Sequence, residues 1–394
     1  MRAAWRGSPH CRRPRRVVYC QARSQQDMTS DAELAAWLAL TYSSGFNLAR
    51  TKAIIGRWCL DAARPLSALF QLSDHELATQ LDLTAAECAA VHRLRGQLNS
   101  HARYCRQIGR NGIRIITRAD PAYPAALTAT LSRSEQPLLL YVRGDMPPPR
   151  VALAAIVGDE ENPDPLTAQI AHDLAVLLAD SGVVLLGAMG QGPGGVVVKG
   201  AFANGCARAL LVAPAGIATV HVEAELARAI AQDRAVILSP FRPDVPGSDL
   251  NTRASHRLLA ALADAVIVMR APAGTPTHDL ATTALQLGRA VYVWDADPDD
   301  TPLSQSHQGL VDAGGVPVNE MADVLDIVAH LTALADGRGG DSQAKPVSDT
   351  PAADVVAGSG TMDPAEVLSV LSRAGRIPDV LRNRLQQRRE VTVR

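Results

Sequence analysis

The middle of the chain alternates short apolar runs with segments of helical period. Val151–Gly158 is an apolar run that ends in glycine, and Pro165–Ala179 follows with apolar residues at helical spacing. A second run, Val183–Leu186, leads into the glycine-rich stretch Gly187–Gly195. Apolar runs without polar alternation are typical of strands that are covered on both faces, as in parallel sheets. The pattern therefore predicts a βαβ unit followed by a glycine-rich loop.

The same alternation repeats toward the C-terminus. Further strands are predicted at Ala209–Ala213, Ala235–Leu238, Ala265–Met269 and Ala290–Trp294, with helical segments such as His221–Gln232 and Leu280–Leu287 between them. We therefore expect an α/β fold with an extended Rossmann-like, doubly wound and mostly parallel sheet. Such sheets bind ligands at the carboxyl ends of their strands, so function is sought first at the glycine-rich loop.

The region before this sheet is helical in pattern. Helices are predicted over 32–42, 48–62, 66–71, 73–81 and 84–108. Ser73 and Glu76 have the spacing of a capping box. The turn Ser43–Asn47 is similar to a helix-hairpin-helix turn, which presents backbone N–H groups to phosphate, but Gly45 is its only glycine. A plain helical packing domain is the alternative.

Composition divides the chain into five predicted parts. These are a basic, disordered leader over 1–30, a small helical (SAM- or helix-hairpin-helix-like) domain over 31–110, the Rossmann-like domain over 111–335, a flexible linker over 336–361 and a short helical remnant over 362–394. Within the last part, Asp363–Glu366 is expected to begin a helix that reaches Ala374. The leader is interpreted as a nucleic-acid arm, a targeting peptide or translated sequence upstream of a start at Met28, and we favour the last.

Charge restricts the class of partner. The chain of 394 residues has a formal net charge of −1, but residues 1–30 carry seven arginines and a single aspartate, so the remainder is acidic. Nucleic-acid binding must then depend on a local basic patch. The six cysteines have no metal-ligand spacing, and no apolar run approaches the roughly 20 residues that cross a bilayer. We expect a cytoplasmic protein without a metal site or membrane contact.

Several motifs occur in a family-specific order. Asp120–Leu127 reads D-P-x-Y-P-x-x-L, Pro137–Asp145 reads P-x-L-L-Y-V-R-G-D, and Ile156–Gly158 reads I-V-G. Lys199–Phe202, Ser255–Val268, Gly288–Tyr292 and Asp312–Gly315 continue the series. Over about residues 35–330 the chain resembles the DNA-processing protein A (DprA/Smf) family.

The resemblance implies a function. Members of that family bind single-stranded DNA and load a recombinase of the RecA type during natural transformation and recombination. We accordingly expect a homodimer that is not an enzyme, has no catalytic residues and needs no cofactor.

The two loops that the family uses for phosphate are altered here. The family's first strand ends I-V-G-S-R, whereas this chain has Glu160 at the arginine position after Gly158. A carboxylate there repels phosphate, so we expect Glu160 to act as an electrostatic gate. In the second loop Gly192 is retained, but Gly194 and Val198 occupy the family's aspartate and histidine positions.

Two basic stretches remain as candidate phosphate contacts. Lys199 lies beside Gly200, with a solvated surface lysine as the alternative. Ser255–Arg257 occupies the family's arginine-asparagine-arginine position, so Arg257 is a candidate phosphate donor and His256 a candidate base-edge or stacking partner. Arg253 is close in sequence. The alternative is a helix N-terminus that Ser255 caps.

Two other functions stay open. Pro272–Asp279 is faintly similar to the P-G-G-x-G-T-x-x-E motif of phosphoribohydrolases, which would indicate a nucleotide- or nucleotide-sugar-binding protein of the same fold. A relative that has lost DNA binding and serves as a protein-interaction module is favoured by Glu160. If single-stranded DNA is bound, we expect the binding to be weak.

Overall fold

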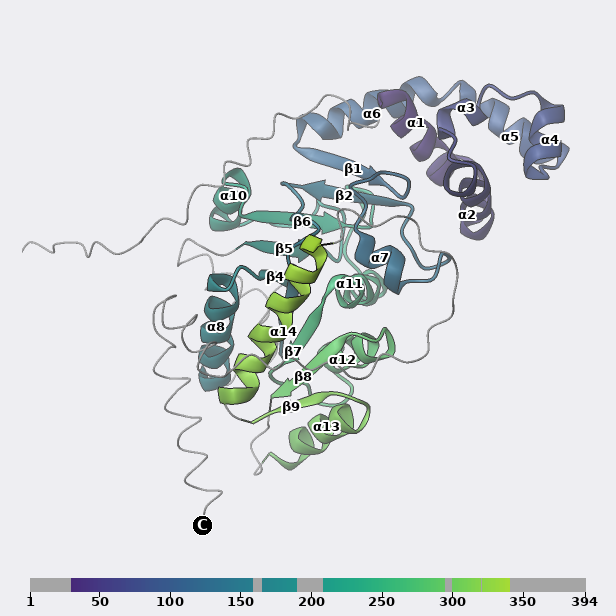
Figure 1. Cartoon of the computed structure of the whole chain (residues 1–394). Coiled ribbons are helices and arrows are strands. Elements are labelled where there is room, and N and C mark those ends of the chain that lie inside the picture. Colours follow the sequence, from purple (N-terminus) through teal and green to yellow (C-terminus); the bar gives the residue numbers. More distant parts are fainter. Residues whose placement is uncertain (1–29, 159–164, 190–207, 295–299, 320, 341–394) are drawn as a thin grey trace, which may run out of the picture.

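A nine-stranded sheet organises the protein (Figure 1). The computed structural model describes residues 30–158, 165–189, 208–294, 300–319 and 321–340. The strand order is β1-β2-β6-β5-β4-β3-β7-β8-β9. Its strands are β1 (Ile113–Thr117), β2 (Leu139–Arg143), β3 (Leu153–Val157), β4 (Val184–Ala188), β5 (Ala209–Val212), β6 (Ala235–Ser239), β7 (Ala265–Val268), β8 (Ala290–Trp294) and β9 (Val316–Val318).

The sheet is mostly parallel, as predicted. All neighbours from β6 to β9 in the strand order pair in parallel, whereas β1 and β2 add an antiparallel edge against β6. Ala155 in β3 is opposite Leu186 on one side and Val266 on the other. The predicted fold class is confirmed.

Helices cover both faces of the sheet (Figure 1). They are α7 (Ala125–Thr130), α8 (Pro165–Asp180), α10 (Ala224–Ala231), α11 (Asp249–Leu262), α12 (Pro276–Gln286), α13 (Thr301–Asp312) and α14 (Met321–Gly340). Ala154 and Ile156 pack into the core under α8 and α14, while Ala155 between them packs into the core under α11 and α12. This alternation explains why β3 is apolar throughout: both of its faces are buried.

The N-terminal region is helical. It contains α1 (Asp31–Leu38), η1 (Ala39–Ser43), α2 (Leu48–Ile55), η2 (Gly56–Asp61), α3 (Leu66–Leu69), α4 (Asp74–Leu81), α5 (Ala85–Arg95) and α6 (Leu98–Arg110), of which η1 and η2 are π-helical turns. The capping box of Ser73 and Glu76 is present on α4. The single helix predicted over 84–108 is instead two, because the chain turns at Gly96–Gln97.

The helical region shares a core with the sheet. Trp37 of α1 belongs to the same buried cluster as Tyr141 of β2 and Ile237 of β6. The hydroxyl of Tyr141 also donates to that of Tyr42 at 3.1 Å. The helices therefore lie against the β1–β2–β6 end of the sheet rather than on a tether.

The last described helix, α14, is held at the edge of the sheet where the parallel strands β3 and β7 begin, which we call the amino edge. Arg338 of α14 contacts both carboxylate oxygens of Asp264, one of them at 3.0 Å, and Asp264 is itself buried. The same carboxylate accepts the backbone N–H of Leu153 at 2.9 Å.

None of the helices in the described part of the chain has both the length and the hydropathy of a membrane span. Residues 336–340, predicted as the start of a flexible linker, instead belong to α14. The leader over 1–29, the linker beyond residue 340 and the whole predicted remnant lie outside the described residues, and the division into five parts stays a prediction.

Candidate nucleic-acid interface

The strand order reverses between β3 and β7, which places a crevice at their carboxyl ends. Gly158 follows β3 at this point and is buried. Thr277, in the first turn of α12, donates its hydroxyl hydrogen to the carbonyl oxygen of Gly158 at 2.9 Å. The end of β3 is thereby joined to the helix that follows β7.

Three of the predicted site residues are not among those that the structure describes. Gly192, Lys199 and Gly200, together with the proposed gate Glu160, lie outside the described residues. Their roles stay predictions. The described candidates are Gly158 and the three residues on α11.

Helix α11 is positioned by two serines. Ser248 is its N-cap and accepts the backbone N–H of Asn251 at 3.2 Å. Ser255 lies inside the helix and donates to the carbonyl oxygen of Ala213, after β5, at 3.0 Å. The alternative in which Ser255 caps the helix is therefore wrong. Instead, Ser255 holds the first half of α11 against the carboxyl ends of the strands.

His256 faces the crevice side of α11. Burial is the main effect on its imidazole and lowers its pKa, against smaller raising effects from a hydrogen bond with the backbone of Pro276 and from the carboxylate of Asp279. His256 is thus neutral at neutral pH and lies beside the first turn of α12, as Gly158 does. It supplies a ring and a polar edge there, but no cation.

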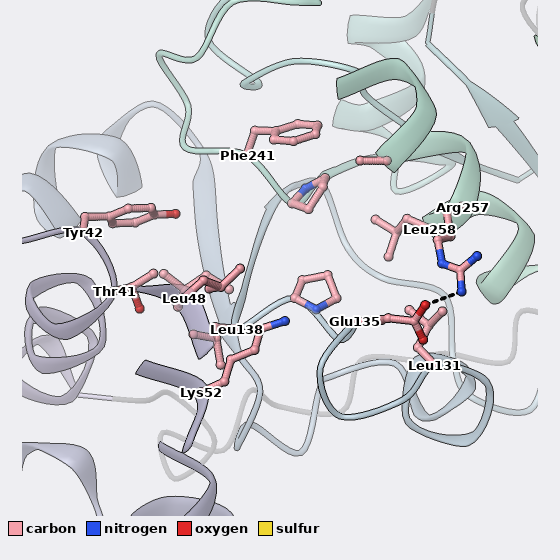
Figure 2. Close-up of a pocket in the computed structure, with 14 residues that line it drawn as sticks. Thr41, Tyr42, Leu48, Lys52, Leu131, Glu135, Leu138, Phe241, Arg257 and Leu258 are labelled. Atoms are coloured by element: carbon pink, nitrogen blue, oxygen red, sulfur yellow. Dashed lines mark hydrogen bonds and ion pairs between the residues drawn. The ribbon is translucent and has the colours of Figure 1, made fainter. Parts of the chain in front are cut away.

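Arg257 points to a different neighbour. Its guanidinium pairs with Glu135, in the loop between α7 and β2 (Figure 2). Glu135 accepts the Ser132 hydroxyl hydrogen at 2.7 Å, and this bond is the main reason why the pKa of Glu135 lies below its usual range. His256 and Arg257 belong to one motif of the sequence, but in the structure their side chains have separate neighbours. Arg253 is exposed and has no ion-pair partner within the described part of the chain.

Two further cations were not singled out from the sequence. Arg270 lies two residues after the end of β7, at the crevice, and pairs with Asp300 at 3.0 Å. Lys52 of α2 reaches across to the carbonyl oxygen of Ser134, and burial lowers its pKa. A charged residue immediately after an apolar run is a signal for Arg270. Nothing local marks Lys52, because its partner is 82 residues away.

The charges at this edge are largely compensated. Arg257, Arg270 and Arg242 each have a carboxylate partner, the last with Asp244 at 2.6 Å. An incoming phosphate must exchange with these carboxylates or share the cations with them. No cluster of metal-ligating side chains occurs among the described residues.

A family model and a curated relative point to the same family. The family model for DNA recombination-mediator protein A matches residues 114–329, more than half of the chain. Protein Smf of Escherichia coli (strain K12) is 27% identical over 207 residues, which are 52% of this chain and 54% of that protein. The chain thus matches about half the length of this curated relative.

A solved structure shares the fold. DNA processing protein A from Streptococcus pneumoniae superposes with a TM-score of 0.57 at 18% identity, over 76% of this chain and 98% of that one. DNA processing protein A from Helicobacter pylori, described for its single-stranded DNA binding mode, gives a TM-score of 0.47 at 19% identity, over 56% of this chain and 96% of that one.

Proposed function

Because the chain belongs to the DNA recombination-mediator protein A family, we propose that it is a DNA-processing protein that binds single-stranded DNA at the carboxyl edge of its sheet. The observation that carries the proposal is the family match over 114–329, which includes both the crevice at Gly158 and the basic turns of α11. By the same family relation, the protein acts in DNA uptake, natural transformation and recombination. It does so as a binding protein rather than an enzyme.

The proposed contacts are of two kinds. Arg253, Arg257 and Lys199 supply positive charge for phosphates, and the glycine backbone at Gly158, Gly192 and Gly200 permits close approach of the strand. His256 supplies a neutral ring near the crevice for a base. The partners proposed with this function are a recombinase of the RecA type and a second copy of the chain.

Compensated charge supports a second candidate, a protein-interaction module that has lost DNA binding. The carboxylates of Glu135 and Asp300 already occupy Arg257 and Arg270. The substitution Arg257→Ala distinguishes the two functions, because it weakens single-stranded DNA binding only if the protein binds DNA through Arg257. A third candidate is a nucleotide-binding protein. In the structure, the segment Pro272–Asp279 that suggested it forms the start of α12, which Thr275 caps.

We expect Arg257→Ala and Lys199→Ala each to weaken single-stranded DNA binding by about 1–3 kcal/mol, the range for a hydrogen bond to a charged group. Fluorescence anisotropy of a labelled oligonucleotide measures this. The matched control is Arg110→Ala, which removes an exposed charge three residues before β1, at the amino edge. Unchanged affinity in both test variants would place the DNA site elsewhere.

A further inference from the structure

A groove of about 470 Å³ separates the helical region from the sheet domain (Figure 2). Its walls come from η1 and α2 on one side, and from the α7–β2 loop, the segment after β6 and α11 on the other. The lining is largely apolar, with Leu48, Leu138 and Phe241 among its residues. Five separate parts of the chain thus converge on one apolar surface.

Exposed apolar side chains gather around this groove. Among the described residues the exposed large hydrophobic ones are Tyr42, Leu48, Leu250 and Val316. Tyr42 and Leu48 line the groove, and Leu250 lies one helical turn before Ala254, which also lines it. Only Val316 lies elsewhere, on the edge strand β9. Scattered apolar residues are normal on a surface, whereas a gathered set marks a binding surface.

The groove is also locally basic. Lys52 and Arg257 line it against the single carboxylate of Glu135, and Arg253 is one turn away from Arg257 on α11. Residues 31–394 as a whole carry more acidic than basic side chains. The complement of this surface is a segment that is both apolar and acidic.

We propose that the groove docks the chain's own segment Asp363–Leu371. This segment reads Asp-Pro-Ala-Glu-Val-Leu-Ser-Val-Leu, with two carboxylates and no basic residue. In the helix that the sequence predicts, Asp363, Glu366, Val367, Val370 and Leu371 share one face. That face presents acidic residues at one end and aliphatic residues along the rest, which matches the groove in both respects.

The end of the described chain lies within reach of the groove. Arg338, two residues before the end of α14, acts electrostatically on Arg289, whose guanidinium bonds to Thr130 at the end of α7. The next residue, Leu131, lines the groove. Arg289 also bonds to Ala261, in the last turn of α11, and α11 leads back to Ala254.

The predicted linker is long enough for this path. The 14 residues of α11 correspond to about 21 Å of helix. Residues 341–362 lie between the end of α14 and Asp363. A flexible chain of that length has a root-mean-square span of about 26 Å. Docking within one chain therefore requires no stretching.

Docking would place Asp363 and Glu366 beside Lys52 and Arg257. Those cations would then be withdrawn from an incoming anion. This consequence rests on the proposed DNA binding, whereas the docking itself does not.

Photocrosslinking of the full chain tests the proposal. Leu48 is replaced by p-benzoylphenylalanine, and crosslinked peptides are identified by mass spectrometry after irradiation. We expect Leu48 to crosslink to residues 362–372. The matched control is the same replacement at Val316, an exposed apolar position on β9. A crosslink of equal yield from Val316 would mean that the tail adheres without specificity, and the proposal would fail.

The same crosslinking on an equal mixture of ¹⁵N-labelled and unlabelled chains shows whether the groove holds the tail of its own chain or that of a second copy. Crosslinks within one isotope class support docking in the same chain. Crosslinks mainly between classes would assign the groove to a second copy, and the absence of any crosslink to 362–372 would also refute the proposal.

Charge reversal gives an independent readout. Glu366→Lys is expected to lower the crosslink yield from Leu48 roughly fivefold, the effect of one exposed ion pair. Glu390→Lys, an equal change later in the tail, is expected to leave the yield unaltered. Equal yields in the two variants would show that Glu366 makes no contact in the groove. Neither outcome depends on whether the protein binds DNA.

Discussion

Glu135 determines how much positive charge α11 presents to solvent. Its carboxylate pairs with Arg257, and Ser132 holds it in place through its hydroxyl and its backbone N–H. These contacts keep the pKa of Glu135 below its ordinary value, so the carboxylate is ionised at neutral pH. The proposed phosphate contact Arg257 is therefore already paired with a carboxylate of the protein itself.

We expect Glu135→Gln to strengthen single-stranded DNA binding roughly fivefold, because it removes one ion pair and one negative charge beside Arg257. Anisotropy titrations at constant ionic strength measure the change. Glu225→Gln removes an equal charge from the exposed surface of α10 and controls for net charge. Equal gains in the two variants would show that proximity to Arg257 is irrelevant.

At this scale the sequence could locate single residues but not their partners. Gly158 was predicted at the end of an apolar run, and it lies there. Glu135 was not anticipated beside Arg257, because 122 residues separate the two and no local spacing relates them. The alternative in which Ser255 caps the helix was wrong for a related reason, since the hydroxyl of Ser255 bonds to Ala213, 42 residues away in the sequence.

Elements were easier to predict than residue roles. The predicted strand Ala209–Ala213 matches the observed β5 to within one residue. The prediction succeeds because a strand that is buried on both faces must be apolar throughout. The break at Gly96–Gln97 was missed, since the helical period continues across it. The antiparallel pairing of β1 and β2 at the edge of the sheet could not be predicted either, because strand order depends on pairings between distant segments.

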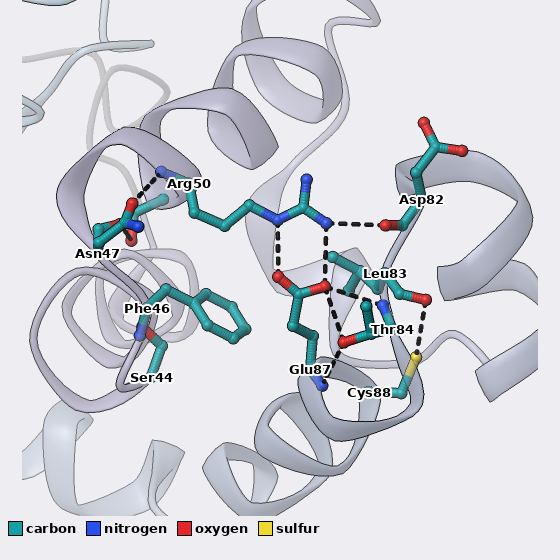
Figure 3. A network of polar contacts seen from close by, with 10 residues as sticks. Ser44, Phe46, Asn47, Arg50, Asp82, Leu83, Thr84, Glu87 and Cys88 are labelled. Atoms are coloured by element: carbon teal, nitrogen blue, oxygen red, sulfur yellow. Dashed lines mark hydrogen bonds and ion pairs between the residues drawn. The ribbon is translucent and has the colours of Figure 1, made fainter.

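Arg50 illustrates how the small helices are held together (Figure 3). It bonds to both carboxylate oxygens of Glu87 on α5, at 2.7 and 3.0 Å, and to the carbonyl oxygen of Asp82 at 2.8 Å. Glu87 also accepts the backbone N–H of Thr84 at 2.8 Å. With Arg50 as the main cause, the pKa of Glu87 falls to about 2.

We expect Glu87→Gln to lower the free energy of unfolding by about 1 kcal/mol at neutral pH, the upper range for a partly exposed ion pair. Because the folded pKa is below the unfolded one, this stabilisation is complete above the ordinary glutamate pKa. It is lost as the pH falls toward about 2. Urea unfolding of both proteins between neutral and acidic pH measures the difference. A difference that persists unchanged in acid would contradict the ion-pair explanation.

At the scale of the whole fold, we expect the helical region and the sheet to unfold as one unit. Trp37, Tyr141 and Ile237 belong to one buried cluster although they come from a helix and two strands. Such a shared core couples the predicted domains over 31–110 and 111–335. We expect a single calorimetric transition for both.

Tyr141→Ala should destabilise the protein by about 3–5 kcal/mol, since it removes a fully buried aromatic side chain. Tyr141→Phe should cost only about 1 kcal/mol, because it removes the hydrogen bond to Tyr42 and leaves the ring. Differential scanning calorimetry compares the two. Two separate transitions in the unmodified protein would show that the helical region folds independently of the sheet.

Single-stranded DNA binding at two salt concentrations tests whether the three cations Lys199, Arg253 and Arg257 hold the phosphates. If they do, the slope of log affinity against log salt is about −2. The affinity should then be weak and should fall roughly fifteen- to twentyfold between about 50 and 200 mM salt. Tight binding that does not respond to salt would show that the strand is not held through phosphate contacts of these cations.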